Sequence, residues 1–335
     1  MVRSDLFSYP PITTPIRVGI IGTGYAAQTR AETFKSDWRS QLITITGHTS
    51  DKTKALCQRF GVEVSESWDE LVRREDLDLV VISTINRDHG KIARAALENH
   101  KHVIVEYPLS LDPIEAQELI ALAQQQNKLL HVEHIELLGG LHTAIRKSIS
   151  HIGQVFYTRY ITINSKHPAP DKWTYQHSLF GFPFCGALSR LHRFTDLWGQ
   201  VQTVQGQSHF WDEQADVYKA CLCTAQLQFS NGTLAEAVYG KGEVFWESEN
   251  IFTLYGENGK LVFTPKQGQL IQGESVQTIE VESRRGLFAK DTHIVLEHLL
   301  HHTPLYVTAS ESAYTLKVAD TVKQSAQTSQ TLVVE

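Results

Sequence analysis

The stretch Ile16–Ala27, which reads IRVGIIGTGYAA, decides how the first part of the chain folds. Its apolar start predicts a buried strand ending at Gly22, and the following residues fit the G-x-G-x-x-G/A fingerprint of dinucleotide-binding turns. Gly22 permits a tight turn, Gly24 lets the backbone approach a pyrophosphate, and Ala27 allows close helix–strand packing. A helix over residues 28–34 would direct its free N–H groups and positive dipole end at the phosphates. The alternative is a glycine-rich loop without a ligand.

Strands and helices alternate from this turn to about residue 135. The strand-like runs are 41–46, 77–83, 101–105 and 129–133, and the helical runs are 53–60, 89–98 and 113–126. Such alternation is typical of a doubly wound parallel sheet. We therefore predict an α/β fold that begins with a Rossmann domain over residues 1–135.

The periodicity changes after residue 135. A β-type stretch over 153–163 is followed by a loop, a helix over 186–198 and strand-like runs from 201 to 281. Turn signals that predict hairpins separate these runs at Asn231-Gly232, Glu257-Asn258-Gly259, Gln267-Gly268 and Gln272-Gly273. Two helices, 288–301 and 309–324, close the chain. Residues 136–335 are thus predicted to form an α+β domain with a large, mainly antiparallel open sheet.

The composition is that of a globular protein long enough for two domains, with 335 residues, 41% hydrophobic and 20% charged. The formal net charge of -6 and the pI near 6.2 argue against nucleic acid or an anionic membrane as the main partner. The four cysteines lack metal-finger spacing, and reduced thiols are the default. Residues 1–15 read as an extended leader without a signal region, and no run reaches transmembrane length. We expect a cytoplasmic protein that is a monomer or a weak homo-oligomer.

Cofactor preference is read where the second predicted strand ends, near Gly47. An NAD-preferring site usually has an acidic residue there, but this chain has no carboxylate before Asp51. Since a carboxylate would repel a 2′-phosphate, its absence favours NADPH. The predicted phosphate-binding residues are His48, Thr49, Ser50, Lys52 and Arg30. The alternative is that Asp51 folds back to the ribose and restores the use of NAD.

A second loop, Thr84–His89, follows the third apolar strand. Ligands of such sheets bind at the carboxyl ends of the strands, so this loop is predicted to line the cofactor. The alternative for His89 is a helix N-terminal residue that only caps. The predicted cofactor-binding set from the two loops and the turn is Gly22, Thr23, Gly24, Tyr25, Ala26, Ala27, His48, Thr49, Ser50, Thr84, Ile85, Asn86 and His89.

Glu106-Tyr107-Pro108 follows the next strand. Together with the motifs before it, this tripeptide gives the chain an arrangement that resembles the Gfo/Idh/MocA oxidoreductase family, and the resemblance covers essentially the whole chain. The resemblance implies a Rossmann domain followed by an α/β domain whose open sheet covers the nicotinamide. Dehydrogenases of the family carry Glu-Lys-Pro where this chain has Tyr107 in the middle. They also carry Asp-x-x-x-His-x-x-Asp on a helix, where this chain has Ser189, Arg193 and Asp196. His192 is one position off, which on a helix turns it about 100° away.

These departures bear on the reaction class. Oxidation of an alcohol needs a general base of near-neutral pKa, and arginine stays protonated in proteins. Arginine binds carboxylates and stabilises developing negative charge instead. The sequence therefore predicts reduction of an anionic, conjugated acceptor. The alternatives are a dehydrogenase of a sugar or a dihydrodiol, and a non-catalytic sensor that binds NADP(H).

The resemblance narrows to one branch of the family, the biliverdin reductases, in particular their cyanobacterial form. The stretches that carry it are 106–108, 131–140, 173–175, 180–183, 187–190, 193–196, 239–245 and 283–288. It implies NADPH-dependent reduction of the C10 methine bridge of biliverdin IXα to bilirubin. Hydride would come from C4 of the nicotinamide, and a proton must reach a pyrrole nitrogen.

The resemblance also implies site residues. Arg190 is the implied catalytic arginine beside the pyrrole, Tyr107 is the second-choice proton donor, and Glu106 is expected near the nicotinamide ribose. A flat ligand with two propionates needs aromatic walls and cationic anchors. The predicted substrate-binding residues are Arg190, Arg193, His134, Trp173, Phe180, Phe182 and Lys241, with Tyr175, Trp246, Arg284 and Arg285 as further candidates. The alternatives are salt bridges from the arginines to Asp196 or Glu106, and a core role for the aromatic rings.

The segment His131-Val-Glu-His134 invites comparison with a metal site. In a strand the two histidines point to opposite faces, and the helical His-Glu-x-x-His context is missing. We therefore predict no metal, and place His134 beside the substrate.

Overall fold

The computed structural model describes residues 12–335, so the predicted extended leader lies outside the described residues up to residue 11. The chain divides into two compact units. The first contains the residues up to Ile135 together with Gly286–Ala313, and the second contains Glu136–Arg285 with Tyr314–Glu335. The sequence assigned 136–335 to one domain, whereas the segment 286–313 packs with the first unit.

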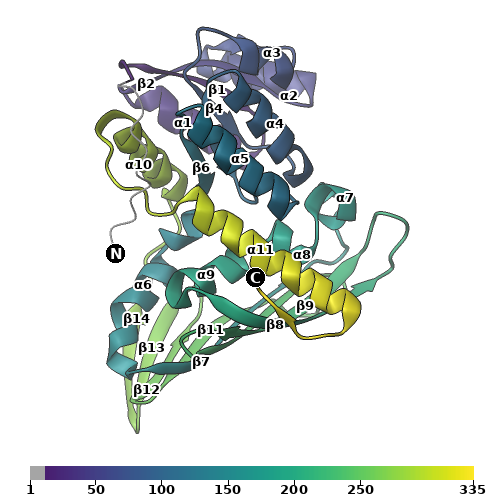
Figure 1. Ribbon diagram of the computed structural model, residues 1–335, viewed down its shortest axis with the longest axis vertical. Helices are drawn as coiled ribbons and strands as arrows, with labels where there is room; N and C mark the ends of the chain where they lie inside the picture. Colours follow the sequence, from purple (N-terminus) through teal and green to yellow (C-terminus); the bar gives the residue numbers. More distant parts are fainter. Residues whose placement is uncertain (1–11) are drawn as a thin grey trace. The chain divides into compact units, whose positions relative to one another are not determined.

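The first unit contains a six-stranded sheet in the order β3-β2-β1-β4-β5-β6, with every pair parallel (Figure 1). Its strands are β1 (Ile16–Ile21), β2 (Ser40–Thr46), β3 (Glu63–Val64), β4 (Leu79–Ile82), β5 (His102–Glu106) and β6 (Leu130–Glu133). Its helices are α1 (Tyr25–Ser36), α2 (Ser50–Phe60), α3 (Trp68–Arg73), α4 (Asn86–Glu98), α5 (Pro113–Gln125) and α10 (Leu287–His301). The order reverses between β1 and β4, which is where doubly wound sheets bind ligands. The predicted Rossmann sheet is confirmed.

Helix α10 joins the first unit through its apolar face. Val295, Leu296 and Leu299 belong to the same buried cluster as Phe34 of α1 and the core residues of β1. Such burial contributes about 1.5–3 kcal/mol for each large aliphatic side chain. The segment that returns to this unit is therefore held mainly by hydrophobic contacts.

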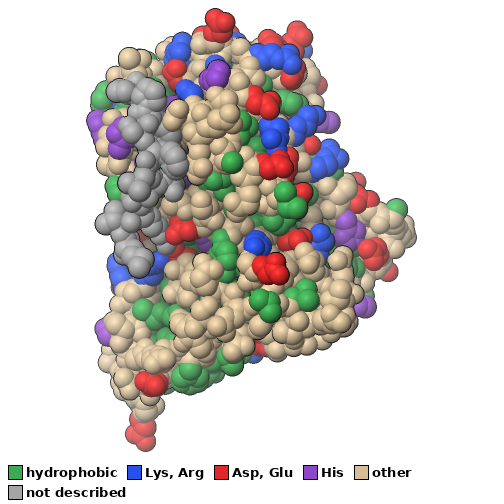
Figure 2. Space-filling model, viewed as in Figure 1, with side chains coloured by type: hydrophobic (Ala, Val, Ile, Leu, Met, Phe, Trp, Pro, Cys, Tyr) green, Lys and Arg blue, Asp and Glu red, His purple; other side chains and the backbone are tan. Residues whose placement is uncertain are grey.

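The surface over α4 and α5 carries intermixed acidic and basic side chains (Figure 2). Arg94 of α4 and Glu118 of α5 form an ion pair at 2.7 Å. Among the described residues, none of the helices has the length and apolarity that crossing a bilayer requires.

The second unit contains a nine-stranded sheet in the order β14-β13-β12-β11-β7-β10-β9-β8-β15. Only β7 and β10 pair in parallel, so the predicted mainly antiparallel sheet is confirmed. Its strands are β7 (Val155–Ser165), β8 (Val201–Trp211), β9 (Ala220–Phe229), β10 (Leu234–Gly242), β11 (Glu249–Gly256), β12 (Gly259–Phe263), β13 (Gln267–Gln272), β14 (Ser275–Glu280) and β15 (Leu332–Val333). Its helices are α6 (Gly140–Ser148), α7 (His177–Phe180), α8 (Pro183–Gly186) and α9 (Ser189–Trp198), with α11 (Ala309–Thr328) belonging to it from Tyr314 onward.

One predicted hairpin turn is wrong. Gln267-Gly268 lies in β13, and the turn comes earlier, closed by the backbone N–H of Thr264 donating to the carbonyl of Gln267 at 2.9 Å. A Cβ on Gly268 would lie 2.3 Å from the ring of Phe263. This glycine therefore serves close packing inside the sheet rather than a turn.

Candidate active site

The turn after β1 has the geometry that its fingerprint requires. Gly22 has a φ of +133°, and a Cβ there would lie 2.2 Å from the carbonyl oxygen of Ser83. Gly24 caps α1, and a Cβ on it would meet nothing within 4 Å. The turn thus excludes a side chain at the first glycine and leaves open space at the second.

The loop after β2 lies against this turn. A Cβ on Gly47 would come 2.6 Å from Cγ2 of Thr23. His48, Thr49 and Ser50 are exposed, and α2 begins at Ser50 with Thr49 as its N-cap. A helix N-terminus favours an anion, and Asp51, in the same first turn, is exposed too.

Arg30, which the sequence offered as a 2′-phosphate ligand, is placed elsewhere. Ala27, Arg30, Ala31 and Phe34 form the buried face of α1, at the spacing of one helical stripe. The guanidinium is fully buried and donates to the carboxylates of Glu106 at 2.9 Å and Asp291 at 2.7 Å. The prediction for this arginine is wrong because the helix register turns it into the interior.

His89 is buried and connects two loops. Its Nδ1 lies 2.8 Å from the carbonyl oxygen of Pro108, and its Nε2 lies 3.3 Å from that of Thr84. Burial lowers its pKa. Thr84 and Ile85 precede α4, and Asn86 is its first residue. His89 therefore holds the loop after β4 against the loop after β5.

Glu106 and Tyr107 lie where β5 ends. Glu106 accepts the bond from Nε of Arg30 and is the register partner of Glu133 in β6. Burial, and next the charge of Glu106, raise the pKa of Glu133 well above its ordinary value. The Tyr107 ring stacks on the His134 ring, with centroids 5.0 Å apart and planes 8° from parallel.

His134 is fully buried, which the sequence did not predict for a substrate neighbour. Its Nε2 lies 2.8 Å from the hydroxyl of Ser312, and its backbone N–H donates to the hydroxyl of Tyr306 at 3.0 Å. His134 follows the last residue of β6 directly, and its ring packs against that of Tyr107.

Asp291 of α10 is a residue that sequence reasoning missed. Its carboxylate accepts bonds from Arg30, from Nε2 of His131 at 2.8 Å and from the hydroxyl of Tyr306 at 2.8 Å. Burial alone would raise its pKa, but Arg30, His131 and Tyr306 together keep that pKa below the ordinary value. Only the fold brings these segments together, so the sequence carried no signal for this cluster.

In the second unit, α9 presents two arginines in different surroundings. Arg190 is half-buried, with its guanidinium 5.9 Å from the ring centroid of Tyr160 and 6.0 Å from that of Tyr239. Arg193 is 2% exposed and donates to the carbonyl oxygen of Glu136 at 2.9 Å and to its carboxylate at 2.8 Å.

Arg284 also pairs with Glu136. The alternative prediction for the arginines is a salt bridge to Asp196 or Glu106. Arg193 does form a salt bridge, but its partner is Glu136. Asp196 bonds instead to His142, at 2.6 Å, and to Arg146. The guanidinium of Arg193 is buried and bonded to Glu136 within the second unit, whereas the sequence predicts that it binds a propionate.

Lys241 lies among the rings of Tyr175, Phe180, Tyr218 and Tyr239 in the same unit. The buried ammonium of Lys241 donates to the carbonyl of Thr174 and lies 3.9 Å from the ring centroid of Phe180. Burial lowers its pKa to about 8. Trp173 packs on Phe180 with centroids 5.8 Å apart. Trp173 and Phe182 are half-buried, Phe180 and Tyr175 are buried, and Trp246 is 86% exposed.

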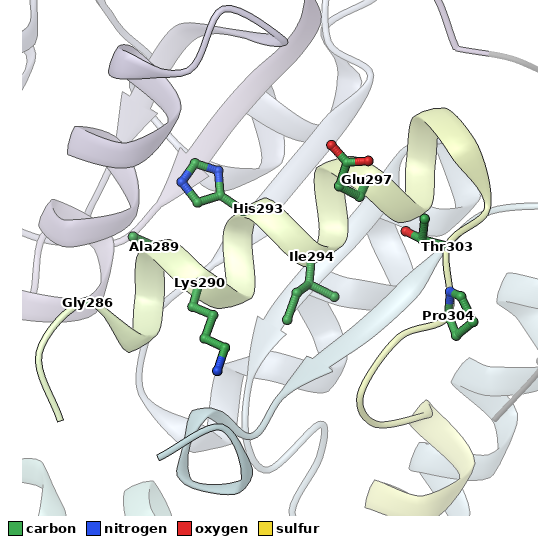
Figure 3. Close-up of a pocket in the computed structure, with 8 residues that line it drawn as sticks. All are labelled: Gly286, Ala289, Lys290, His293, Ile294, Glu297, Thr303 and Pro304. Carbon is green, nitrogen blue, oxygen red and sulfur yellow. The ribbon is translucent and has the colours of Figure 1, made fainter. Parts of the chain in front are cut away.

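A surface pocket of about 590 Å³ lies along α10 (Figure 3). Its lining residues are Gly286, Ala289, Lys290, His293, Ile294, Glu297, Thr303 and Pro304. None of the predicted site residues lines it. In the part of the chain that the structure describes, no group of three or more His, Cys, Asp or Glu residues is arranged to hold a metal ion.

Comparisons with known proteins agree over both units. Residues 16–134 match the Gfo/Idh/MocA oxidoreductase family, NAD-binding Rossmann fold, and residues 146–335 match the C-terminal alpha/beta domain of that family. Biliverdin reductase A of Mus musculus is 25% identical over 283 residues, which cover 84% of this chain and 85% of that protein. The human protein is 26% identical over 84% of this chain and 86% of its own length.

Solved structures give the same picture. The biliverdin reductase of Synechocystis sp. PCC 6803, crystallised with biliverdin and NADP+, is 53% identical with a TM-score of 0.92. The match covers 94% of this chain and all of that one. A levoglucosan dehydrogenase, 18% identical with a TM-score of 0.83, shares the fold.

Proposed function

The chain belongs to the Gfo/Idh/MocA oxidoreductase family, and within it we propose that the protein reduces biliverdin IXα at its C10 methine bridge, giving bilirubin, with NADPH as the reductant. The observation that carries this proposal is the 53% identity, over nearly the whole chain, to a biliverdin reductase that holds biliverdin and NADP+. It is an NAD(P)H-dependent oxidoreductase acting on a conjugated carbon framework.

The first unit fits the cofactor. The space beside Gly24 suits the diphosphate, and the loop against Thr23 ends in a helix N-terminus without a carboxylate before Asp51. When bound, NADPH supplies a hydride from C4 of its nicotinamide. We propose that the turn residues and His48, Thr49 and Ser50 bind the phosphates, while Thr84, Ile85 and Asn86 line the ring side. His89 fixes that loop, and Glu106 lies beside the nicotinamide ribose.

The second unit supplies the electrophilic side of the reaction. Hydride addition at C10 places negative charge on the conjugated pyrrole system, and a proton must reach a pyrrole nitrogen to complete the product. Arg190, held over the faces of Tyr160 and Tyr239, is the residue we propose to stabilise that charge and to relay the proton. Tyr107 is the second choice, because its phenol is protonated at neutral pH.

The wall of the substrate site is proposed to come from aromatic residues of the second unit. Trp173 and Phe182 are half-buried and have surface to offer a flat ligand, while Phe180 packs behind Trp173. Lys241 stiffens this wall through its contacts with Phe180 and Thr174. Its ammonium has three N–H donors, so it can donate to a propionate while it is bonded to the Thr174 carbonyl.

The family's alcohol-oxidising chemistry is less well supported here. The helix position of the family's histidine holds Arg193, which is buried and paired with Glu136. Arginine stays protonated in proteins, so Arg193 cannot act as the base that accepts a proton from a substrate hydroxyl.

We further propose a cytoplasmic location, since all four cysteines are free, and a monomer or weak homo-oligomer.

The proposal is tested by mixing the pure protein with biliverdin and NADPH and following the long-wavelength band of the pigment. We expect the band to disappear with one NADPH oxidised per biliverdin. Gly22→Ala is the matched control, because its Cβ would lie 2.2 Å from the Ser83 carbonyl and distort the cofactor turn. No colour change by the unmodified protein at any pH would contradict the proposal.

A further inference from the structure

We propose that Asp291, on the segment that returns to the first unit, is a positioning residue that holds both Glu106 and Tyr107 in their working places. The proposal rests on the proposed function for the meaning of those two side chains. The contacts of Asp291 themselves lie entirely within the first unit.

One arm of the arrangement runs from Asp291 to Glu106. Asp291 and Glu106 bind different nitrogens of the same guanidinium, that of Arg30, at 2.7 Å and 2.9 Å. Thr292, the next residue of α10, accepts a bond from the same Arg30 nitrogen that binds Asp291, at 3.2 Å. The guanidinium is rigid and planar, so fixing one edge on α10 fixes the direction in which its Nε meets Glu106.

The other arm runs from Asp291 to Tyr107. Tyr306 donates its hydroxyl proton to Asp291 at 2.8 Å, and its oxygen accepts the backbone N–H of His134 at 3.0 Å. The ring of His134, fixed also by Ser312, carries the stacked ring of Tyr107. Asp291 thus reaches two adjacent residues of the β5 end by two separate routes.

The charge of Asp291 is what joins the arms. Its side chain is fully buried, and its oxygens together accept bonds from Arg30, His131 and Tyr306. A buried carboxylate is tolerated only when it is paired and fully bonded, so these donors and the carboxylate hold each other in one geometry. A neutral amide of the same shape would weaken every bond at once, because charge-assisted bonds are roughly twice as strong as neutral ones.

A positioning role predicts a particular split of the kinetic constants. Asp291 bonds to Arg30, His131 and Tyr306 and not to the diphosphate turn, Gly22–Ala27, so its loss should reach the cofactor only through Glu106 and should change NADPH affinity little. Misplacing groups at the reacting end by a fraction of an ångström lowers kcat instead. A residue needed only for folding would lower the melting temperature without that selective effect.

The test compares Asp291→Asn, Tyr306→Phe, the double variant and Glu297→Gln in the full chain. Glu297 is the matched control, an acid of the same helix that pairs with Arg39 outside this cluster. We expect D291N to lower kcat for biliverdin by roughly ten- to a hundredfold and to change the NADPH dissociation constant much less. Y306F should lower kcat less, and the double variant should be no slower than D291N, because both act through the same contacts. E297Q should match the unmodified protein.

Wild-type kcat in both D291N and Y306F would overturn the inference while leaving the proposed function intact. If D291N does not fold, Y306F alone decides, since it keeps Asp291 and Arg30 and breaks only the route to Tyr107. An unmodified protein that does not reduce biliverdin would overturn the proposed function alone. In that case a crystal structure of the variants decides: an unmoved Tyr107 and Glu106 would overturn the positioning role.

Discussion

Each unit buries an arginine in an ion-paired cluster, and the two clusters have opposite charge. In the first unit Arg30 lies between two carboxylates, Glu106 and Asp291. In the second unit the arrangement is reversed, and the carboxylate of Glu136 lies between Arg193 and Arg284. The acid-rich cluster fixes the end of β5, and the base-rich cluster lies next to the helix that carries Arg190.

The difference between the two clusters indicates different roles for the two units of this chain. Arg30 is held in the interior by its carboxylate partners, and we therefore propose that the turn residues with His48, Thr49 and Ser50 bind the phosphates. In the second unit Arg193 and Arg284 are paired with Glu136, so Arg190 is the arginine that we propose to stabilise the negative charge that the substrate gains on reduction. The following variants break or sharpen this comparison.

Removing the central arginine of each cluster should have the largest effect. Arg30→Ala leaves two carboxylates in or near the interior and should lower the free energy of unfolding by about 3–5 kcal/mol. Arg193→Ala should cost less, because Arg284 still pairs with Glu136. Denaturant unfolding measures both, with Arg159→Ala, a half-exposed partner of Glu236, as a control below about 1 kcal/mol. Equal losses for R30A and R159A would contradict the buried-cluster description.

Arg190→Ala separates the catalytic arginine from the structural one. We expect kcat for biliverdin to fall about a hundredfold, the loss typical of removing one donor to developing charge. NADPH binding and the melting temperature should change little, because Arg190 is half-buried and lies against tyrosine rings. Steady-state kinetics with fluorescence titration of NADPH measures this split. Full activity in R190A would remove Arg190 from the mechanism.

Glu133 tests the excess of acid in the first cluster through pH. Its folded-state pKa lies above that of the unfolded chain, so the folded protein binds more protons once the pH exceeds the ordinary value near 4.5. The free energy of unfolding therefore falls as the pH rises from the unfolded-state pKa of Glu133 to its folded-state pKa, by up to about 1.4 kcal/mol per pH unit. Glu133→Gln should flatten the decline in the free energy of unfolding measured against pH. Parallel curves for the two proteins would show that Glu133 is not a source of it.

The smallest effect is expected at the phosphate-binding loop. Ser50→Asp adds a carboxylate at the exposed N-terminus of α2 and should raise the KM for NADPH about fivefold while leaving that for NADH unchanged. Asp51→Asn is the control, and it should not weaken NADPH. An unchanged KM for NADPH in S50D, or NADH used as well as NADPH by the unmodified protein, would mean that this loop does not read the phosphate.

The features that could be predicted from the sequence are those that depend on local backbone preferences and on the spacing of apolar residues. The turn at Gly22, the alternation of strands and helices and the hairpin at Asn231-Gly232 follow from short-range patterns. Helices α1, α2 and α4 begin three residues earlier than predicted, because their first turns, at the carboxyl ends of the strands, carry no apolar periodicity.

What failed depended on long-range packing. Arg30, predicted to bind a phosphate, lies on the buried face of α1 with Glu106 and Asp291, and Arg193, predicted as a propionate anchor, is buried against Glu136. The partners that decide these roles, Asp291 and Glu136, lie far along the chain or in another segment. No local pattern of charge distinguishes them from solvent-exposed acids.

The central claim is transfer of a hydride from NADPH to C10 of biliverdin. It is tested most directly with NADPH carrying deuterium at the transferred position of nicotinamide C4, followed by mass spectrometry and proton NMR of the pigment product. We predict one deuterium per bilirubin, located at C10. In the control reaction, with unlabelled NADPH in deuterated water, we predict no deuterium at C10. An unchanged pigment, or a product without deuterium at C10, would contradict the account.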